Sequence, residues 1–303
     1  MDLRQLAALT AVAEAGSFSA AARRLHTVQS NVSTHVARLE AELGATLVDR
    51  STGTLTDEGD VVVSRARRIQ HELESLRADV DSMLHEVSGA VRLGCIGTVG
   101  RWLVPRLLQG MEARHPRVHV VVVDATTTSL VPQLVAESLD LAVINLPLGG
   151  GELATEPLFD EDRIILAPLD HPLAAEATVE LAQLADHALL LEPQGTAFRD
   201  ELDDAVRPIG VTLDVQAEID GIRLLTSLAF DGFGAAMVPA TAAPAWMGAA
   251  CRRVRVNGLT PRSVGLASPR RARLSAPARA VRDVVRDLVA ATEQPGVHPT
   301  LAA

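Results

Sequence analysis

The stretch GSFSAAARRLHTVQSNVSTHVARLEAELGATLVDR, residues 16–50, decides the fold of the N-terminal part of the chain. Before it, apolar residues recur at helical spacing from Leu3 to Ala13, and Gly16 is a natural end for that first helix. Ser17 or Ser19 can cap a second, short helix, whose small residues allow close packing against a neighbour. The sequence therefore predicts two packed helices at the start of the chain.

A third helix is predicted after a short break near Thr27, and it ends at Gly44. One face of this helix carries the apolar residues Val32, Val36, Leu39 and Leu43. Three short helices with a tight turn between the second and third predict a helix-turn-helix. The following residues 45–59, which contain several Thr and Gly, suit a short β-wing.

Residues 60–88 contain no Gly or Pro and repeat apolar side chains at alternating spacings of four and three. These side chains are Val62, Ala66, Ile69, Leu73, Leu76, Val80, Met83 and Val87. An unbroken period of about 3.5 residues over about four heptads is typical of a coiled coil. We therefore predict a long linker helix that pairs two copies of the chain through Ile69, Leu73, Leu76 and Val80. The alternative is a helix that lies on its own domain.

From residue 89 onward, strands and helices alternate in the manner of parallel α/β units. The predicted strands VRLGCIG, VHVVVVDA and LDLAVINL alternate with the helices WLVPRLLQGMEARHP and SLVPQLVAES. The alternation continues from RIILAPL to a closing helix, PARAVRDVVRDLVAAT. The last residues, 293–303, contain Pro295 and Pro299 and are expected to be frayed. The predicted fold class is α/β overall, behind an all-α N-terminal domain.

Composition limits the classes of protein to which the chain can belong. Its 303 residues are 48% hydrophobic, which is enough for two or three domain cores and excludes wholesale disorder. The apolar runs are too short to cross a bilayer, and the N-terminus lacks the pattern of a secretory signal. Because there are only two cysteines, far apart, we expect no disulfide framework and a cytoplasmic location.

The net charge of −10 argues against a sequence-independent nucleic-acid coat. It does not exclude a DNA reader, of which only the contacting face must be positive. All 28 basic residues are Arg, and residues 1–50 balance five Arg with five acidic residues. Affinity for DNA must therefore come from local Arg placement and from dimerisation.

Residues 16–59 resemble the N-terminal signature of the LysR family of transcriptional regulators. The matching positions are Gly16, Ser17, Phe18, Ala21, Ala22, Leu25, His26, Gln29, Ser33, Leu39, Glu40, Leu43, Gly44, Arg50, Leu55, Thr56 and Gly59. The segments LVPRLLQGMEARHPRVHVVV and FGAAMVP extend the resemblance, more loosely, over the rest of the chain. Val28 departs from the family pattern, so that Thr27 would have to cap the recognition helix, and Thr34 replaces a longer polar side chain.

The resemblance implies three parts: a winged helix-turn-helix DNA-binding domain at 1–59, a linker and dimerisation helix at 60–88, and an effector-binding domain at 89–303. In the family, the last part has the two-lobed α/β fold of periplasmic binding proteins, with two crossing strands as a hinge. Mapped onto this chain, the first lobe covers about 90–161 and 267–303, and the second covers about 162–266.

The apolar face of the third helix leaves its other face for contacts with base edges, and the resemblance supports that role. The side chains expected there are Gln29, Ser30, Ser33 and Thr34. Phosphate contacts are expected from Arg23, Arg38 and Arg50. The alternative for each of these residues is an ordinary solvated surface.

The family's effector site lies between the two lobes, and the resemblance places residues of both lobes there. They are Thr98, Arg101, Thr127 and Thr128 from the first lobe, and Gln194, Thr196 and Phe198 from the second. A hydroxyl and backbone N–H groups at a helix start can hold an anion, and Arg101 or Arg199 can neutralise a carboxylate. Threonines at strand ends also often cap local structure only. We expect a small organic acid or amino acid as co-inducer, with no metal and no other cofactor.

Other classes of protein supply the alternatives. A redox sensor would resemble the peroxide-sensing branch of the family, but residues 189–210 contain no cysteine, Cys95 lies in an apolar strand, and Cys251 lacks an evident partner. An enzyme is not expected, because the sequence has no metal-spaced His pair, no nucleophile motif and no phosphate loop. A ligand-independent architectural DNA-binding protein is the remaining alternative.

The resemblance also implies a set of partners. These are double-stranded promoter DNA, further copies of the chain in a dimer or homotetramer, a small-molecule effector and RNA polymerase, with no membrane. Ligand closure of the lobes would change the shape of the tetramer and the bend of the DNA. Such a switch requires that the ligand binds the two shapes with different affinity.

Overall fold

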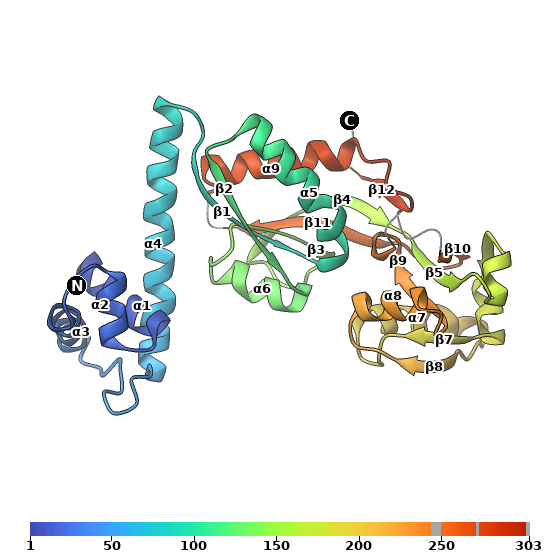
Figure 1. Cartoon of the computed structure of the whole chain (residues 1–303), viewed down its shortest axis with the longest axis horizontal. Coiled ribbons are helices and arrows are strands. Elements are labelled where there is room, and N and C mark those ends of the chain that lie inside the picture. Colours follow the sequence, from blue (N-terminus) through green and yellow to red (C-terminus); the bar gives the residue numbers. More distant parts are fainter. Residues whose placement is uncertain (244–249, 271–272, 301–303) are drawn as a thin grey trace. The chain divides into compact units, whose positions relative to one another are not determined.

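The computed structural model describes residues 1–243, 250–270 and 273–300 (Figure 1). It separates into two compact units, residues 1–81 with 136–138 and residues 82–135 with 139–303, and each is described by itself. Within the described ranges, no helix has both the length and the apolar character needed to span a bilayer.

The first unit begins with three helices around one apolar core: α1 (Leu3–Ala15), α2 (Phe18–Arg24) and α3 (Gln29–Leu43). Asp2 caps α1 through a capping box with Gln5, and α1 ends at Gly16, whose φ of 68° favours glycine. Ser17 caps α2, since its Oγ accepts a hydrogen bond from the backbone N–H of Ala20 at 3.2 Å. The first of the two predicted caps is therefore confirmed.

A short wing follows α3, in which Val48 and Leu55 form an antiparallel bridge. The wing lies against the start of α4 (Asp57–Leu84), and Gly59 makes this approach possible. A Cβ at Gly59 would lie 2.1 Å from the carbonyl oxygen of Leu47, so only glycine fits without movement of the backbone. Thr56 caps α4 by accepting a hydrogen bond from the Gly59 N–H at 3.0 Å.

The 28 residues of α4 form a helix roughly 42 Å long at 1.5 Å per residue. Its bounds differ from the predicted 60–88 at both ends. It begins at Asp57 because Thr56 supplies the cap, and its first turn is acidic, which complements the positive end of the helix dipole. It ends at Leu84, five residues before the first strand of the second unit.

The second unit contains two six-stranded sheets. The first sheet has the order β12-β4-β11-β3-β1-β2, with β1 parallel to β2 and β3, and β11 antiparallel to β3 and β4. Its strands are β1 (Gly89–Cys95), β2 (Val118–Asp124), β3 (Leu141–Leu146), β4 (Leu153–Glu161), β11 (Arg262–Pro269) and β12 (Val297–Pro299). Helices α5 (Gly97–Arg114) and α9 (Ala276–Ala290) pack together on one face, and α6 (Thr127–Val135) covers the other (Figure 1).

The second sheet has the order β6-β10-β5-β9-β7-β8. Its strands are β5 (Arg163–Pro168), β6 (Thr178–Glu180), β7 (Ala188–Leu191), β8 (Asp214–Glu218), β9 (Ala235–Pro239) and β10 (Cys251–Asn257). The α-helices packed on it are α7 (Ala197–Val206) and α8 (Ile222–Phe230). The 3-10 helices in this part of the chain are η1 (Pro172–Ala175), η2 (Leu181–Asp186), η3 (Arg207–Ile209) and η4 (Ala240–Ala242).

The chain crosses between the sheets twice, and these crossings divide the second unit into two lobes. The first crossing lies at Asp162, between β4 and β5. The second lies at residues 258–261, between β10 and β11, and therefore earlier than the predicted boundary at 266/267. The boundary moves because RSVGLASP is one continuous strand, whose whole length pairs with β4.

The C-terminal segment departs from the sequence prediction. Residues 297–299 are not frayed but form β12, which pairs antiparallel with the end of β4. Val297 is buried there, and the backbone N–H of Asp162 donates to the carbonyl of Gly296 at 2.8 Å. Two prolines in the segment thus do not prevent an edge strand, since β12 needs only one paired side. Residues 301–303, also part of that prediction, lie outside the described residues.

Candidate DNA-binding and effector-binding sites

Helix α3 has one buried and one exposed face, in the orientation that its sequence predicts. Val32, Val36 and Leu39 are buried in the core of the first unit. The opposite face exposes Gln29, Ser30, Thr34, Ala37 and Arg38, with Ser33 half-buried. A helix with this division can present short polar side chains to a DNA groove while its other face remains packed.

Gln29 and Thr34, two of the polar side chains of this face, already make hydrogen bonds that determine what they can donate. The Ser19 hydroxyl donates to Oε1 of Gln29 at 3.0 Å, which fixes the amide and leaves its NH2 group free to donate. The Thr34 hydroxyl donates to the Ser30 carbonyl at 2.8 Å, so its proton is used inside the helix. Gln29 is therefore better placed than Thr34 to donate to a base.

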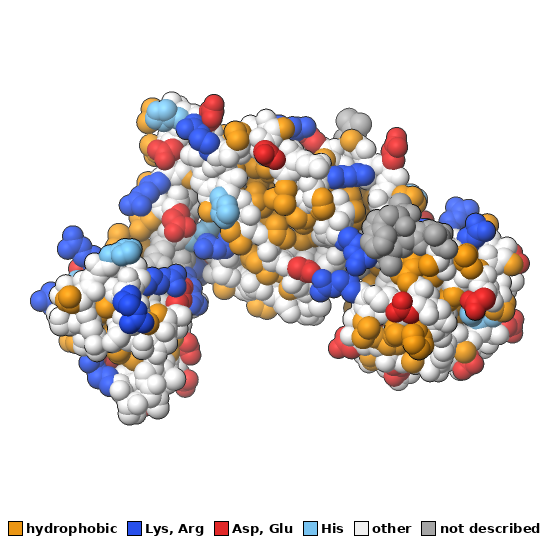
Figure 2. All heavy atoms as spheres, in the orientation of Figure 1, with side chains coloured by type: hydrophobic (Ala, Val, Ile, Leu, Met, Phe, Trp, Pro, Cys, Tyr) orange, Lys and Arg blue, Asp and Glu red, His pale blue; other side chains and the backbone are white. Residues whose placement is uncertain are grey.

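The three predicted phosphate contacts differ in their surroundings. Arg50, from the wing, donates to Oγ of Ser33 at 3.2 Å and to Oε2 of Glu40 at 3.3 Å, and its guanidinium lies over the ring of Phe18 at 5.7 Å. Arg23 and Arg38 are exposed and have no side-chain partner among the described residues. Figure 2 shows several Arg side chains on the visible face of this unit. Arg23 and Arg38 are therefore more available than Arg50 for a contact with a phosphate.

Glu40 was not among the predicted site residues, yet it joins the wing to α3. Its Oε1 accepts from the backbone N–H groups of Leu47 at 2.9 Å and Val48 at 3.3 Å, while its Oε2 holds Arg50. The Leu39-Glu40 pair of the LysR signature is the feature of the sequence that could have identified this role. The contacts of Glu40 fix the geometry of the wing relative to α3.

The predicted cap of α3 by Thr27 is wrong. The N-cap residue is Val28, which makes no side-chain cap hydrogen bond. The Thr27 hydroxyl instead accepts from Nδ2 of Asn31 at 3.0 Å. The free N–H groups of the first turn of α3 therefore remain available to a phosphate.

Thr98, on the first turn of α5, is buried at the junction of the two lobes. Its Oγ1 accepts a hydrogen bond from Nη2 of Arg262 at 2.8 Å. Arg262 also pairs with Oε2 of Glu161, at 2.7 Å from Nε and 2.6 Å from Nη2. Oε1 of Glu161 accepts from the backbone N–H of Thr241 in η4. Arg262 and Glu161 were not predicted as site residues, because neither belongs to a motif that stands out in the sequence.

Thr127, at the start of α6, is held in a similar way. Its Oγ1 accepts from the backbone N–H of Asn145 at 3.1 Å. Thr128 differs, since its hydroxyl pairs with that of Thr126 at 2.9 Å and is exposed. Close to Thr127, Oδ1 of Asn145 is buried without a hydrogen-bond partner among the described residues.

These contacts determine what the two threonines can offer a ligand. A hydroxyl carries one proton, and when it accepts from a fixed donor that proton is free to be donated elsewhere. Thr98 accepts from Arg262 and Thr127 from the Asn145 N–H, and no acceptor for either proton is found in the described part of the chain. Both hydroxyls are therefore set to donate.

The start of α5 carries a second polar group. Ile96 provides no side-chain cap, but the carboxylate of Asp124 lies beside this helix end, where a Cβ at Gly97 would be 2.8 Å from its Oδ1. Arg223, from α8 of the second lobe, donates to Asp124 at 2.5 Å. An acidic side chain thus already complements the helix dipole at the place where the sequence predicted an anion.

The predicted residues of the second lobe are mostly engaged in local structure. Thr196 caps α7, accepting from the Arg199 N–H at 3.4 Å and donating to the Pro193 carbonyl at 2.9 Å. The Phe198 ring packs beneath the guanidinium of Arg163 at 5.2 Å. Gln194 is exposed, as is Arg101 of the first lobe, so neither is held in place by packing.

The contacts of Arg199 do not favour it as the group that neutralises a ligand carboxylate. Arg199 is 5% exposed and donates to Asp203 at 2.9 Å, to Glu218 at 3.2 Å and to the Glu192 carbonyl at 3.1 Å. Its charge is already balanced by the chain. The Glu192 carboxyl has a raised pKa because of its burial, and Asp220 adds to that effect while Arg262 opposes it.

Both cysteines are buried. Burial, with a smaller contribution from Asp124, raises the pKa of Cys95 to about 12. Burial, with a smaller contribution from Asp170, raises the pKa of Cys251 to about 11, and its Sγ donates to the Ala229 carbonyl at 3.2 Å. Neither thiol is activated as a nucleophile. Within the described residues, no group of three His, Cys, Asp or Glu side chains is arranged to hold a metal.

The apolar repeat of α4 is largely uncovered within its own unit. Ile69, Leu76 and Val80 are 39%, 58% and 49% exposed, and Leu73 is half-buried. Near its N-terminal end, Val63 and Ala66 pack into the core of the first unit instead. The helix therefore both anchors to the N-terminal core and carries an exposed apolar seam.

Comparison with protein families covers almost the whole chain. Residues 3–60 match the model of the bacterial regulatory helix-turn-helix protein, lysR family, and residues 85–290 match the LysR substrate binding domain. A relative from Mycobacterium leprae (strain TN), named probable hydrogen peroxide-inducible genes activator, is 35% identical over 246 residues, 79% of this chain and 78% of the relative. The uncharacterized HTH-type transcriptional regulator YfeR of Shigella flexneri is 30% identical over 288 residues, 94% of each chain.

Solved structures show the same arrangement of elements. A full-length, singly substituted OxyR from Pseudomonas aeruginosa superposes with a TM-score of 0.76 at 25% identity, covering 100% of this chain and 99% of that one. Full-length CbnR complexed with its target DNA gives a TM-score of 0.71 at 24% identity, over 95% of this chain and 99% of that one, and so supports the fold alone. Sequence signature, fold and family matches agree, and the chain belongs to the LysR family of transcriptional regulators, with a DNA-binding helix-turn-helix and a substrate-binding domain.

Proposed function

We propose that this regulator reads promoter DNA through α3 and responds to a small organic acid or amino acid held by Thr98 and Thr127. One observation supports this class of ligand. The Thr98 hydroxyl accepts from Arg262, and the Thr127 hydroxyl accepts from the Asn145 N–H, so that each hydroxyl can donate its own proton to a ligand. A carboxylate offers the acceptors that two such donors need.

The remaining polar groups near these threonines restrict the proposed class of ligand further. Oδ1 of Asn145 has no hydrogen-bond donor among the described residues. The partly buried Glu192 carboxyl interacts electrostatically with Arg262. An amino acid presents both an acceptor carboxylate and a donor ammonium, so it satisfies more of these groups than a plain diacid does. Gln194 and Phe198 line the same site in this proposal, and Thr196 acts by shaping its loop. Arg101 and Thr128 supply polar contacts at the rim.

On DNA, Gln29, Ser30 and Ser33 contact base edges, and Thr34 contributes its exposed methyl and its hydroxyl oxygen as an acceptor, since its hydroxyl proton is donated to the Ser30 carbonyl. Arg23 and Arg38 contact phosphates, and Arg50 does so while holding Ser33 and Glu40 in place. Phosphate contacts set the position of the protein, and base contacts set its sequence preference. We place this activity in the cytoplasm, where the chromosome and RNA polymerase are available.

Assembly follows from exposed apolar side chains. The seam of α4, with Ile69, Leu73, Leu76 and Val80, pairs two copies, because apolar side chains at coiled-coil spacing gain most when they face a second helix. The second unit also exposes apolar side chains over α5 and near α8 (Figure 2). Large apolar side chains that this unit leaves exposed include Leu108, Val121, Leu224 and Phe233. A second interface at these surfaces converts dimers into a homotetramer.

A peroxide-sensing role is the second candidate, because several relatives are named for induction by hydrogen peroxide. The thiol chemistry that it requires is not supported here. Both cysteines are buried with raised pKa values, and residues 189–210 contain no cysteine. A small-molecule effector is therefore the better proposal.

The test is fluorescence anisotropy with labelled DNA from the region upstream of the gene. Organic acids and amino acids are screened for a shift in the binding midpoint of the full chain. An active compound should lose its effect in Thr98→Val, while DNA affinity without the compound stays unchanged. Thr155→Val is the matched control, since Thr155 is exposed on β4 and lies outside the proposed ligand contacts. An unaltered response in Thr98→Val and Thr127→Val would reject the proposed ligand contacts.

A further inference from the structure

Residues 295–300, which we call the β12 strap, contact both lobes of the second unit. The strap is attached to the first lobe by β12, which pairs antiparallel with the end of β4. After β12, the backbone N–H of Thr300 donates to the Leu158 carbonyl at 2.9 Å. Val297 is 7% exposed and packs into the apolar core of the first lobe. This end of the strap is therefore part of that lobe.

The other end of the strap contacts the second lobe. Nη2 of Arg253, on β10, donates to the carbonyl of Pro295 at 3.0 Å and to the carbonyl of Ala240, in η4, at 2.9 Å. A Cβ placed on Gly296 would lie 2.6 Å from the Cβ of Ala240, so the backbone of the strap passes close to η4. Gly296 has a φ of 74°, which favours glycine. The start of the strap is thus packed against the second lobe.

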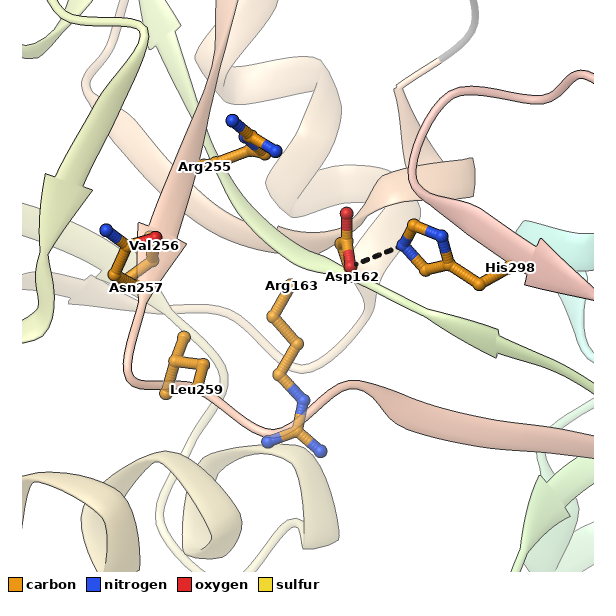
Figure 3. A pocket seen from close by; sticks show the side chains of 7 residues that line it. All are labelled: Asp162, Arg163, Arg255, Val256, Asn257, Leu259 and His298. Carbon is orange, nitrogen blue, oxygen red and sulfur yellow. Dashed lines mark hydrogen bonds and ion pairs between the residues drawn. The ribbon is translucent and has the colours of Figure 1, made fainter.

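The strap also binds the first crossing between the lobes. Asp162 lies at that crossing, and its backbone N–H donates to the Gly296 carbonyl at 2.8 Å. Its Oδ1 lies 2.9 Å from Nε2 of His298, on β12 (Figure 3). Its carbonyl accepts from the backbone N–H of Ala240 at 2.9 Å. The chain at the crossing is therefore bonded both to the strap and to η4.

These contacts resist a rotation of one lobe against the other. A rotation that moves η4 and β10 away from β4 has to break the bond between Arg253 and Pro295 or pull β12 from β4. Burial lowers the pKa of Arg253, while Glu161 and Asp162 oppose that effect. A partly buried charged donor that loses an acceptor costs more free energy than an exposed one, which water can satisfy.

We propose that the β12 strap is a third, non-covalent link between the lobes, which limits the angle through which they rotate about the two crossings. Hinge rotation requires that a few connecting residues change their backbone angles. Because the N–H and the carboxylate of Asp162 are both bound to the strap, Asp162 can change its angles only if the strap moves with it. The chain makes all of these contacts by itself, so the link acts whatever the effector proves to be.

Pulsed electron spin resonance on the full chain measures the relative position of the lobes. Spin labels are placed at Glu112→Cys, on α5 of the first lobe, and at Asp204→Cys, on α7 of the second. Both positions are exposed, whereas the two native cysteines are buried. Labelled chains are mixed with an excess of unlabelled chain, so that the distances within one chain are measured. One narrow distribution of distances is expected for the wild type.

Gly296→Val places a side chain against Ala240 and should push the strap off the second lobe, which widens the distribution about twofold. Gly210→Val is the matched control, because Gly210 has a similar φ of 68° but open space around its Cβ. Arg253→Gln removes the bond to Pro295 and should widen the distribution less. Its control is Arg252→Gln, at an exposed position of the same strand, which should leave the distribution unchanged.

Circular dichroism first establishes that each variant is folded, and Arg253→Gln decides alone if Gly296→Val does not fold. Widening in at least one of these two variants, with none in its control, supports the strap. A wild-type distribution in every folded variant of the pair would overturn the assignment. Equal widening in Gly210→Val or in Arg252→Gln would overturn it as well, since the change would then not depend on the strap.

Discussion

The two units of this regulator treat the same kinds of side chain in opposite ways. In the N-terminal unit, Arg23 and Arg38 are exposed and have no partner among the described side chains, and the apolar seam of α4 is uncovered. In the C-terminal unit, Arg199 is buried, Arg262 is mostly buried, and both are balanced by carboxylates of the chain. The first unit therefore leaves Arg23 and Arg38 available to DNA and leaves the apolar seam without cover in its own unit. The second balances Arg199 and Arg262 within the chain, so that the hydroxyl protons of Thr98 and Thr127 are what it offers a ligand.

The largest effect is expected from the uncovered seam. Leu76→Asp places a charge on the exposed apolar face of α4 and should convert the proposed dimer to monomers, measured by size-exclusion chromatography with light scattering. A monomer can bind only one of the two half-sites of an operator, and it loses the gain in affinity from linked binding. Affinity for operator DNA should therefore fall by about a hundredfold or more. The control is Glu72→Asp, on an exposed polar position of the same helix. Dimers that persist in Leu76→Asp would show that another surface pairs the chains.

The next largest effect concerns stability of the C-terminal unit. Arg262→Gln leaves the fully buried Glu161 carboxylate without its cation, and such a loss costs about 3–5 kcal/mol of unfolding free energy. Arg223→Gln removes the exposed partner of Asp124 and should cost less than about 1 kcal/mol. Urea denaturation of both variants measures the contrast. Equal losses would mean that burial does not distinguish these two arginines.

A smaller effect is expected for the free arginines of the DNA-binding face. Arg38→Gln should weaken binding to all DNA sequences by about tenfold and reduce the slope of log affinity against log salt by about one, without changing stability. Arg24→Gln is the control, because Arg24 pairs with Glu14 at 2.8 Å. The measurement is anisotropy over a series of salt concentrations. A loss confined to one DNA sequence would instead assign Arg38 to a base contact.

The smallest effect is expected from peroxide. With thiol pKa values of about 12 and about 11, fewer than about one thiol in a thousand is ionised at neutral pH. Micromolar peroxide should therefore leave operator binding unchanged, and a thiol reagent should label the folded protein only slowly. Rapid labelling of Cys251, or a peroxide-dependent shift lost in Cys251→Ala, would support the redox alternative.

What the sequence could predict depended on whether a feature was local. The period of Val32, Val36 and Leu39 specified the buried face of α3, and the helical spacing in α4 specified its seam, because both follow from the geometry of one helix. The Arg262–Glu161–Thr98 network joins residues up to 164 positions apart in sequence, and no pattern marks it. The same holds for Arg253 and for the β12 strand, whose partners become visible only when the fold is known.

Sequence-specific DNA reading by α3 is tested most directly by an anisotropy titration of the full chain on its own upstream intergenic DNA and on unrelated DNA of equal length, at two salt concentrations. We predict tight binding that resists unrelated competitor on the first DNA, and weaker, strongly salt-dependent binding on the second. Equal affinity for the two DNAs at both salt concentrations would contradict this prediction, because the exposed face of α3 would then carry no sequence preference for this DNA.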